Sequence, residues 1–468
     1  MRNGLPRFRV LIGLAFRTSL VAIACVQVAH AQLGGVQLPN LPRVDLPNTV
    51  TGTVNGVTGQ VTNELGNVQR LADLRQLRIR DLLRTQRQFV ERDPRGAPIL
   101  RAELVAFSPT DAALESARSA GFTVARERTL EGLDARVVVL RAPERMSTRR
   151  ALARIRALDP NGAYDYNHIY LDSGEVLDSE KVLGGEKSRS ERRTAGARSR
   201  LLLATTAQSA EASPAQSSSS GIKIGLIDGG VDASHPVFSD AVIHQHGCAD
   251  KPIPSPHGTA VASLMIGRSS AFHGASPGAE LFAADVYCGS GVGGAVDAVA
   301  DAMGWLVRER VPVMNVSLVG PRNVTLENVV RIVIARGHVI VAAVGNDGAA
   351  APPLYPASYP GVIGVTGVDA KQKVLLEACR GPQVDFAAPG ADMAAAMLSP
   401  SFAAVRGTSF AAPIVAGLLA ARVNEPNSAL AEKAFTQLAH EAMDLGAKGV
   451  DKVYGNGLVG ASIRTAMN

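Results

Sequence analysis

Three residues in the second half of the chain have the chemistry needed to activate a hydroxyl group. Asp228 ends a short apolar run, His257 stands in a Pro-His-Gly-Thr segment, and Ser409 stands in a Gly-Thr-Ser segment before a long apolar stretch. A serine hydroxyl becomes a nucleophile when an imidazole takes its proton, and a carboxylate fixes the tautomer of that imidazole and stabilises its charged form. The three residue types therefore suit nucleophilic acyl transfer.

A fourth residue suits stabilisation of an oxyanion. Asn346 follows another apolar run, where its amide can donate a hydrogen bond to developing negative charge. A helix beginning at Ser409 would add a backbone N–H and a favourable dipole. Each residue alone is more often a cap, a turn residue or a structural residue. The order Asp, His, Asn, Ser on an α/β scaffold favours a catalytic triad.

The elements that must position these residues alternate between strands and helices. β-Branched runs predict strands at Ile222–Ile227, Leu281–Val286, Val311–Val316, Val339–Val344 and Val362–Val365. Helices are predicted at Thr259–Ile266, Gly294–Glu309, Leu326–Arg336 and Ser409–Val423. Apolar strands alternating with helices are typical of a mainly parallel sheet covered on both faces, with the chemistry beyond the carboxyl ends of its strands. We predict such an α/β fold over residues 221–468.

The same region resembles the subtilisin-like serine peptidases, the subtilase family. The resemblance rests on Ile224–Asp228 with Gly230 and His235-Pro236, His257–Thr259, Asn315–Leu318, Gly345-Asn346, Tyr355–Ala357, Tyr359-Pro360, Ala387–Gly390, Gly407–Ser409 with Ala411–Pro413, and Tyr454–Gly457. It implies that Asp228, His257 and Ser409 form the triad and that Asn346 is the oxyanion donor. It also implies a serine endopeptidase that hydrolyses polypeptides through an acyl-enzyme.

The resemblance further implies a pocket for the residue before the scissile bond. The predicted pocket residues are Ser317, Leu318, Val319, Gly320 and Val344. Val319 stands where the family has glycine, and Val344 replaces a smaller residue. A narrow pocket that prefers Ala, Val or Leu over Phe or Tyr follows, because pockets discriminate by fit. In the alternative, both valines point into the core.

Other departures from the family pattern bear on activity. Gly229 replaces the usual Ser or Thr after the aspartate, so a hydroxyl is missing there, and Ala260 replaces a common His. Gly229 motivates the alternative function, a non-catalytic protein-binding pseudopeptidase on the same fold.

The loop between Gly267 and Pro277 lacks the residues that hold calcium in many relatives. We expect no metal and no cofactor, and calcium binding is left open because no site for it is identified.

An independent module is predicted over residues 100–171. Its elements are Arg101–Phe107, Asp111–Ala120, Thr123–Thr129, Arg136–Leu140, Ser147–Leu158 and Tyr164–Leu171. This β-α-β-β-α-β order is ferredoxin-like. By resemblance the module is a propeptide domain that folds and inhibits the peptidase, which makes the protein a zymogen. An unrelated α+β domain is the alternative. The charged, Ser-rich residues 172–220 predict a disordered linker.

The N-terminal region predicts export. Residues 1–31 read as a signal peptide, with basic residues before the apolar Ser19–Val28 and small residues at Ala29 and Ala31. The apolar stretch is too short to favour a membrane anchor, so we expect a secreted or periplasmic protein without a stable membrane span. Residues 32–99 read as a flexible leader and a basic amphipathic helix over 67–92, either solvated on its neighbour or on a membrane surface.

Composition and charge narrow the function classes. The 468 residues are 46% hydrophobic, enough for a sizeable core. Residues 221–468 carry 17 basic and 20 acidic side chains, so the excess of positive charge lies in residues 1–220, which have 31 basic and 22 acidic side chains, and we expect no nucleic-acid partner. Of the cysteines after the signal, Cys248 and Cys288 flank the His257 helix and are expected to pair, leaving Cys379 free. We expect a monomer.

Overall fold

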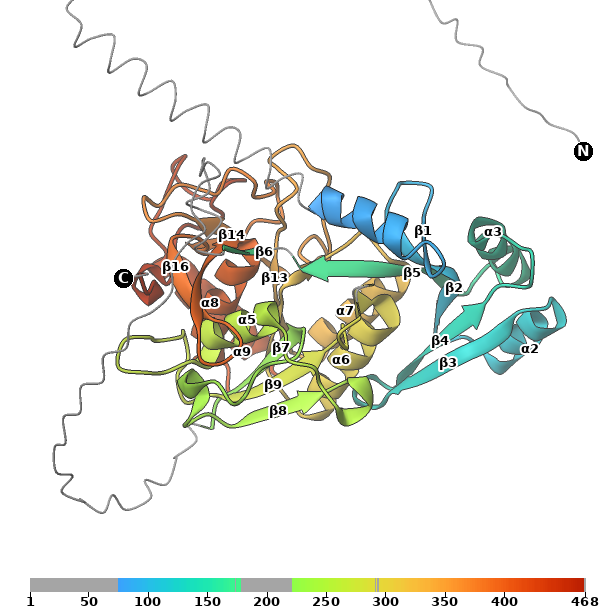
Figure 1. Ribbon diagram of the computed structural model, residues 1–468, viewed down its shortest axis with the longest axis horizontal. Coiled ribbons are helices and arrows are strands. Elements are labelled where there is room, and N and C mark those ends of the chain that lie inside the picture. The colour runs from blue at the N-terminus through green and yellow to red at the C-terminus, as the bar shows by residue number, and fades with distance from the viewer. Residues whose placement is uncertain (1–74, 173, 178–220, 291, 293, 467–468) are drawn as a thin grey trace, which may run out of the picture. The chain divides into compact units, whose positions relative to one another are not determined.

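The structure is a computed structural model, and it describes residues 75–172, 174–177, 221–290, 292 and 294–466 (Figure 1). The predicted signal peptide, residues 32–74 of the predicted leader and residues 178–220 of the predicted linker lie outside these described residues. Among the described residues, no helix is both long enough and apolar enough to span a membrane.

One sheet contains seven strands that all run parallel, in the order β15-β14-β13-β11-β7-β9-β8. Its strands are β7 (Lys223–Asp228), β8 (Ile243–His246), β9 (Glu280–Asp285), β11 (Val313–Val316), β13 (Val339–Ala343), β14 (Ile363–Val368) and β15 (Phe386–Pro389). The predicted α/β fold with a mainly parallel sheet is therefore confirmed.

Helices cover both faces of this sheet (Figure 1). The helices α5 (Pro256–Ile266), α8 (Thr408–Ala420) and α9 (Ser428–Glu441) share one apolar core with one face, and α6 (Val296–Arg308) and α7 (Val324–Ala335) share another core with the opposite face. The strands are buried on both sides, which explains their near-continuous apolar sequences.

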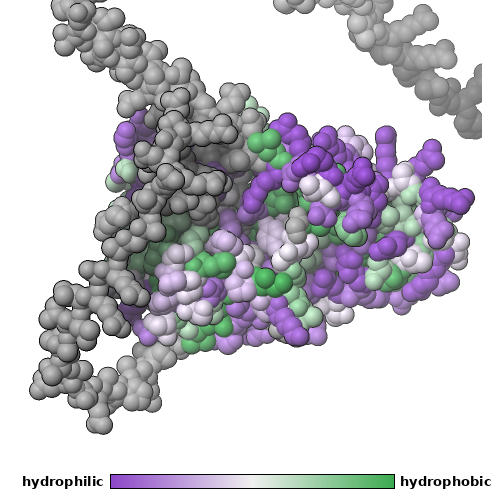
Figure 2. Space-filling view, viewed as in Figure 1, coloured by the Kyte–Doolittle hydropathy of each residue, from purple (hydrophilic) through white to green (hydrophobic). Residues whose placement is uncertain are grey.

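The N-terminal unit has the predicted ferredoxin-like order of elements. They are β2 (Pro98–Phe107), α2 (Asp111–Ser119), β3 (Thr123–Leu130), β4 (Ala135–Arg141), α3 (Thr148–Leu158) and β5 (Ala163–Asp172). Thr110 and the predicted cap Ser147 accept hydrogen bonds from the first turns of the two helices. One sheet face packs on α2 and α3, and the other packs on α6 and α7. Hydrophilic residues dominate the surface of this unit that Figure 2 shows.

The prediction of a basic helix over 67–92 is wrong at the C-terminal end of that range. Among the described residues the helix covers only 75–85, and β1 (Val90–Arg92) then pairs antiparallel with β2. The Asp93 side chain accepts hydrogen bonds from the backbone of Arg95 and Ala97, which forms a tight turn between the two strands. Pairing with β2 thus overrides the local helical pattern.

The disordered linker predicted from residue 172 is also wrong at its start. Residues Gly174–Leu177 form β6, which pairs with β17 (Phe402–Gly407) beside β16 (Met393–Ala396). The composition of this segment does not predict a strand, because the strand is stabilised by pairing with β17. The helix predicted from Gly294 begins instead at Val296, because Gly294–Ala295 form β10, which pairs with β5. Strand β12 (Leu318–Val319) also pairs with β5.

Short 3-10 helices complete the described chain. They are η1 (Glu131–Leu133), η2 (Pro236–Phe238), η3 (Cys248–Asp250) and η4 (Ala461–Ile463).

Candidate active site

The three predicted triad residues lie where strands end or helices begin. Asp228 is the last residue of β7, and His257 lies in the first turn of α5, whose start is capped by Ser255. Ser409 is the second residue of α8, after Gly407, whose φ of 141° favours glycine. Parallel strands and the helices that follow them bring their ends to one edge of the sheet, so residues 181 positions apart meet there.

The three side chains form a continuous hydrogen-bonded series. His257 Nδ1 lies 2.9 Å from both Asp228 carboxylate oxygens, and His257 Nε2 lies 3.0 Å from Ser409 Oγ. Asp228 and Ser409 are 1% and 0% exposed, and His257 is 9% exposed. The imidazole is thus placed to take the serine proton, while the carboxylate holds the opposite ring nitrogen.

The electrostatics of the site favour the imidazolium. Burial alone would lower the pKa of His257, but the charge and hydrogen bond of Asp228 outweigh burial and raise that pKa. A raised pKa suits a base that must hold a proton while the oxyanion exists.

Asn346 follows β13 and lines the same cavity as Asp228 and His257. Its Oδ1 accepts a hydrogen bond from the Thr408 N–H at 3.2 Å, and the neighbouring Gly345 N–H donates to Thr408 Oγ1. These bonds orient the amide beside the start of α8. The first backbone N–H groups of a helix lack partners within that helix, and Ser409 is the second residue of α8.

A series of buried hydrogen bonds holds the backbone of Ser409, and it includes one residue that sequence reasoning missed. Ser317 Oγ donates to the Ser409 carbonyl at 2.9 Å, and Asn315 Nδ2 donates to Ser317 Oγ at 2.8 Å. Both residues are fully buried. Ser317 was predicted to bind substrate, whereas its hydroxyl here holds the backbone of Ser409. Asn315 begins the Asn-Val-Ser-Leu motif, but the motif alone does not reveal which group the Asn315 side chain contacts.

The N-terminal unit runs into this site. Strand β5 pairs antiparallel with β10 on one side and with β12 on the other, with Tyr170 opposite Gly294 and Leu171 opposite Val319. The chain then continues as β6, where Gly174 pairs with Gly407. A Cβ atom on Gly174 would lie only 2.1 Å from Ser409 Oγ. The chain therefore passes directly over the serine hydroxyl.

Tyr170 anchors the incoming strand. Its side chain is fully buried, and its hydroxyl donates to the Pro321 carbonyl at 2.5 Å. A Cβ atom on Gly320 would lie 2.7 Å from the Tyr170 ring, so the absent side chain leaves room for it. Gly320 thus lies against the Tyr170 side chain of β5.

The two valines predicted to narrow the pocket are fully buried. Val319 and Val344 belong to the apolar core between the sheet and α6 and α7, as does the predicted pocket residue Leu318. None of the three lines the active-site cavity of about 890 Å³. This placement agrees with the alternative in which the valines point into the core.

The N-terminal helix over 75–85 reaches the same cavity, a role that its sequence did not reveal. Arg78 forms a salt bridge with Asp172 at the end of β5, and Arg75 Nη1 lies 2.6 Å from Asp347, next to Asn346. Leu82 packs with Ile169 and with the partly buried Leu171 of β5. The helix therefore lies over the end of the strand that occupies the site.

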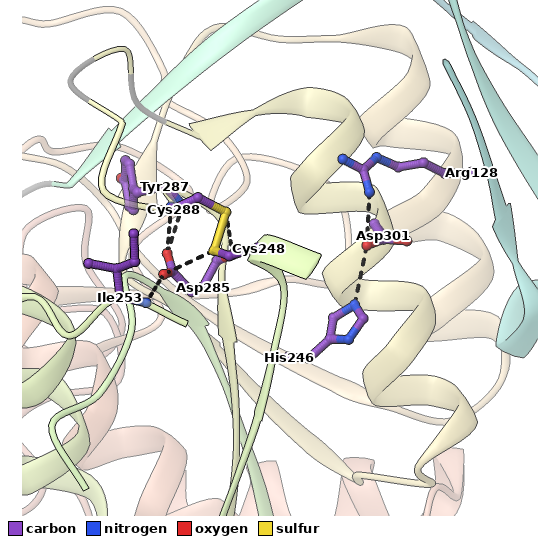
Figure 3. The surroundings of a disulfide bond; sticks show 8 residues. All are labelled: Arg128, His246, Cys248, Ile253, Asp285, Tyr287, Cys288 and Asp301. Carbon is purple, nitrogen blue, oxygen red and sulfur yellow. Dashed lines mark hydrogen bonds and ion pairs between the residues drawn. A yellow bond between two sulfur atoms is a disulfide. The ribbon is translucent and has the colours of Figure 1, made fainter. Parts of the chain in front are cut away.

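Cys248 and Cys288 are joined by a disulfide with a Cα–Cα distance of 5.2 Å, and Cys379 is a buried free thiol. Figure 3 shows the carboxylate of Asp285 beside this bond, where it accepts hydrogen bonds from the backbone N–H groups of Ile253, Tyr287 and Cys288. The bond ties the segment before α5 to the segment after β9.

The disulfide also bears on metal binding. Asp285, Cys248 and Cys288 are close enough together to hold an ion. Since the two sulfur atoms are bonded to each other, this arrangement does not offer thiolate ligands.

Comparisons with known proteins agree with this geometry. The family model described as "Subtilase family" matches residues 219–457. Subtilisin E of Bacillus subtilis (strain 168) is 32% identical over 217 residues, which cover 43% of this chain and 55% of that protein. Subtilisin Savinase of Lederbergia lenta is 32% identical over 252 residues, which cover 53% of this chain and 91% of that protein. The chain thus spans about half the length of several curated relatives that it matches.

A solved structure has a similar fold. Fervidolysin from Fervidobacterium pennivorans, described as a keratinolytic enzyme related to subtilisin, superposes with a TM-score of 0.61 at 19% identity. The match covers 80% of this chain and 62% of that one. At this identity the likeness concerns the fold.

Proposed function

Because this chain belongs to the subtilase family, we propose that it is a serine endopeptidase that hydrolyses polypeptides and is made as a zymogen. The observation that carries the proposal is the series Asp228–His257–Ser409, with a segment of the same chain lying over the serine. A protein that only binds peptides needs the cleft, but it has no use for an imidazole 3.0 Å from a buried serine hydroxyl.

The geometry supports the following sequence of steps. Ser409 Oγ bonds to the carbonyl carbon of the scissile peptide while its proton moves to His257 Nε2, and Asp228 stabilises the resulting imidazolium. The oxyanion accepts hydrogen bonds from Asn346 Nδ2 and the Ser409 N–H. The carbon–nitrogen bond then breaks as His257 gives its proton to the leaving amine. Water attacks the acyl-enzyme, loses a proton to His257, and Ser409 recovers its hydroxyl.

The first substrate, we propose, is the chain itself. Gly174 lies against Ser409 Oγ, and Asp172 ends the strand held between β10 and β12. Self-cleavage between Asp172 and Gly174 would separate the N-terminal unit from the rest. The unit would remain as an inhibitor, since β5 fills the cleft through backbone pairing on both sides and through the buried Tyr170.

Export is the proposed setting. The signal-like pattern over residues 1–31 supports it, and a disulfide between Cys248 and Cys288 suits an oxidising compartment. The periplasm and the medium both meet this condition.

An active-site probe tests the proposal. A fluorophosphonate should label the wild-type protein covalently and leave Ser409→Ala unlabelled, with both proteins folded by circular dichroism. Labelling that is equal in the two proteins, or absent from a folded wild type with an open cleft, would favour the pseudopeptidase instead.

The acid limb of the pH profile tests the role of His257. The imidazole must be neutral to accept the serine proton, and its pKa is raised from the ordinary value of about 6.5. We therefore expect kcat/KM for a peptide to fall as pH drops, with a midpoint above about 6.5. A profile that stays flat through this range would contradict His257 as the base.

A further inference from the structure

Ser255 occupies the space beside Gly229. A Cβ atom on Gly229 would lie 2.3 Å from Ser255 Oγ and 2.9 Å from Ser255 Cβ, distances that real Cβ atoms do not tolerate. Gly229 is the position at which the subtilase resemblance places Ser or Thr. The place of the missing side chain is therefore filled from another segment of the chain.

Ser255 also joins the end of β7 to the start of α5. Its N–H donates to the Gly230 carbonyl at 2.9 Å, its carbonyl accepts from the Thr259 N–H at 3.0 Å, and its Oγ accepts from the Gly258 N–H at 3.0 Å. The last of these is the N-cap of α5, which satisfies a donor that the helix itself cannot.

These two elements carry Asp228 and His257. The Gly229 N–H donates to Asp228 Oδ1 at 2.7 Å, and the same oxygen lies 2.9 Å from His257 Nδ1. The backbone is also tightly packed, because a Cβ atom on Gly258 would lie 2.3 Å from the Gly229 carbonyl. A shift of residue 229 relative to residue 255 would therefore change the Asp228–His257 contact.

We propose that Ser255 is a positioning residue that sets His257 against Asp228, and that Gly229 and Ser255 form a reciprocal pair in which only one position can carry a side chain. The proposal rests on the proposed function, since it concerns the geometry of the same triad. Ser255 fills the space that a side chain at position 229 would occupy, so the absence of a hydroxyl at Gly229 is not a defect of the site.

A double-mutant cycle on the full chain tests this pair. In Gly229→Ser, relief of the 2.3 Å contact needs a displacement of about 1 Å, and misplacements of that size cost on the order of 10- to 100-fold in rate. Ser255→Gly retains most of the capping preference but empties the space, and we expect a several-fold loss of kcat. In the double variant Gly229→Ser/Ser255→Gly the new side chain enters the emptied space, and kcat should return to within about threefold of the wild type.

The pH profile separates positioning from stability. A weaker Asp228–His257 contact lowers the pKa of His257, so the acid limb of kcat/KM should move to lower pH in each single variant and return in the double variant. Ser255→Ala, which keeps Cβ and removes only Oγ, isolates the contribution of the hydroxyl. Thermal unfolding identifies any variant that is simply unfolded.

Two results would overturn the pair. One is a double variant whose loss equals the product of the single losses, and the other is a Ser255→Gly protein with unchanged kcat and unchanged acid limb. Failure of the proposed function looks different, because the wild type itself would then neither bind the fluorophosphonate nor cleave any peptide.

Discussion

Two of the contacts that the N-terminal region makes are built differently. At the flank interface, Arg126 and Arg128 of β3 contact Asp297 and Asp301 of α6. At the cleft contact, Arg75 of the helix over 75–85 pairs with Asp347 of the rest of the chain, and Arg78 pairs with Asp172 within the N-terminal region. The first shares a buried carboxylate among several donors, and the second consists of separate ion pairs beside the cavity that Asp228 and His257 line.

The flank interface contains the most buried carboxylate of these ion pairs. The Asp297 side chain is 2% exposed and accepts hydrogen bonds from Arg126, Arg128 and Asn167. Arg126 also holds Glu103 through both terminal nitrogens. A buried charge is costly without its partners, so removing any member leaves the others unsatisfied. Flank residues should therefore control how tightly the N-terminal unit is attached.

The cleft contact lies at the cavity that Asp228 and His257 also line. Arg78 is 52% exposed at its side chain, and exposed ion pairs stabilise by only about 0.2–1 kcal/mol. Yet its partner Asp172 ends the strand that leads to Ser409. Different residues therefore determine how tightly the N-terminal unit is attached and which contacts lie near Ser409, and substitutions can separate the two.

The largest expected effect comes from Asp297→Asn. The loss of the charge shared by the two arginines should cost about 1–3 kcal/mol after discounting for the partial exposure of Arg126 and Arg128, or about 10- to 100-fold in the affinity of the cleaved N-terminal fragment. Gel filtration of the self-cleaved protein, with the released fragment quantified, measures this affinity.

Asp111→Asn is the matched control, because Asp111 also pairs with an arginine but its side chain is 92% exposed on the outer side of the unit. Equal release by the two variants would mean that the flank interface does not govern attachment.

The second expected effect is release by acid. Burial opposes ionisation of Asp297, but hydrogen bonds from Arg126 and the charges of Arg126 and Arg128 outweigh it and lower its pKa. A carboxyl whose pKa is lower in the bound state strengthens binding fully above its ordinary pKa of about 3.9, and the contribution disappears as pH falls through the lowered value.

Titration of fragment release between pH 6 and pH 2 measures the acid effect, with return to pH 6 to check that it is reversible. The Asp297→Asn variant should release its fragment with a weaker pH dependence than the wild type. The same pH dependence in both proteins would show that other groups control release.

The smallest expected effect comes from Arg78→Ala. We expect the fragment to dissociate at a rate within about twofold of the wild type, because the Arg78–Asp172 ion pair is exposed and joins two residues of the same fragment. Arg84→Ala is the control, since Arg84 lies on the same helix and pairs only locally with Asp81. An effect of Arg78→Ala as large as that of Asp297→Asn would erase the distinction between the two contacts.

The sequence predicts the parallel sheet and the placement of its polar strand ends well. β-Branched runs and glycine turns are local signals, and the parallel topology brings their ends to one edge, so Asp228, His257 and Ser409 could be expected to meet. The pairing of Cys248 with Cys288 followed from their position on either side of the His257 helix.

What the sequence does not predict depends on partners distant in the chain. Strand β6 forms because β17 offers an edge, and β1 forms because β2 does, although neither segment has a strong strand pattern of its own. The fit of Ser255 against Gly229 likewise depends on the approach of α5 to β7, which no local pattern encodes.

Self-cleavage tests the central claim most directly, namely that Asp228, His257 and Ser409 act on a segment of their own chain. The measurement is intact mass spectrometry of the purified wild type and of Ser409→Ala. We expect the wild type to give two fragments that separate between Asp172 and Gly174, and Ser409→Ala to remain uncleaved there. A wild-type chain that stays intact, or the same cleavage in both proteins, would contradict the account.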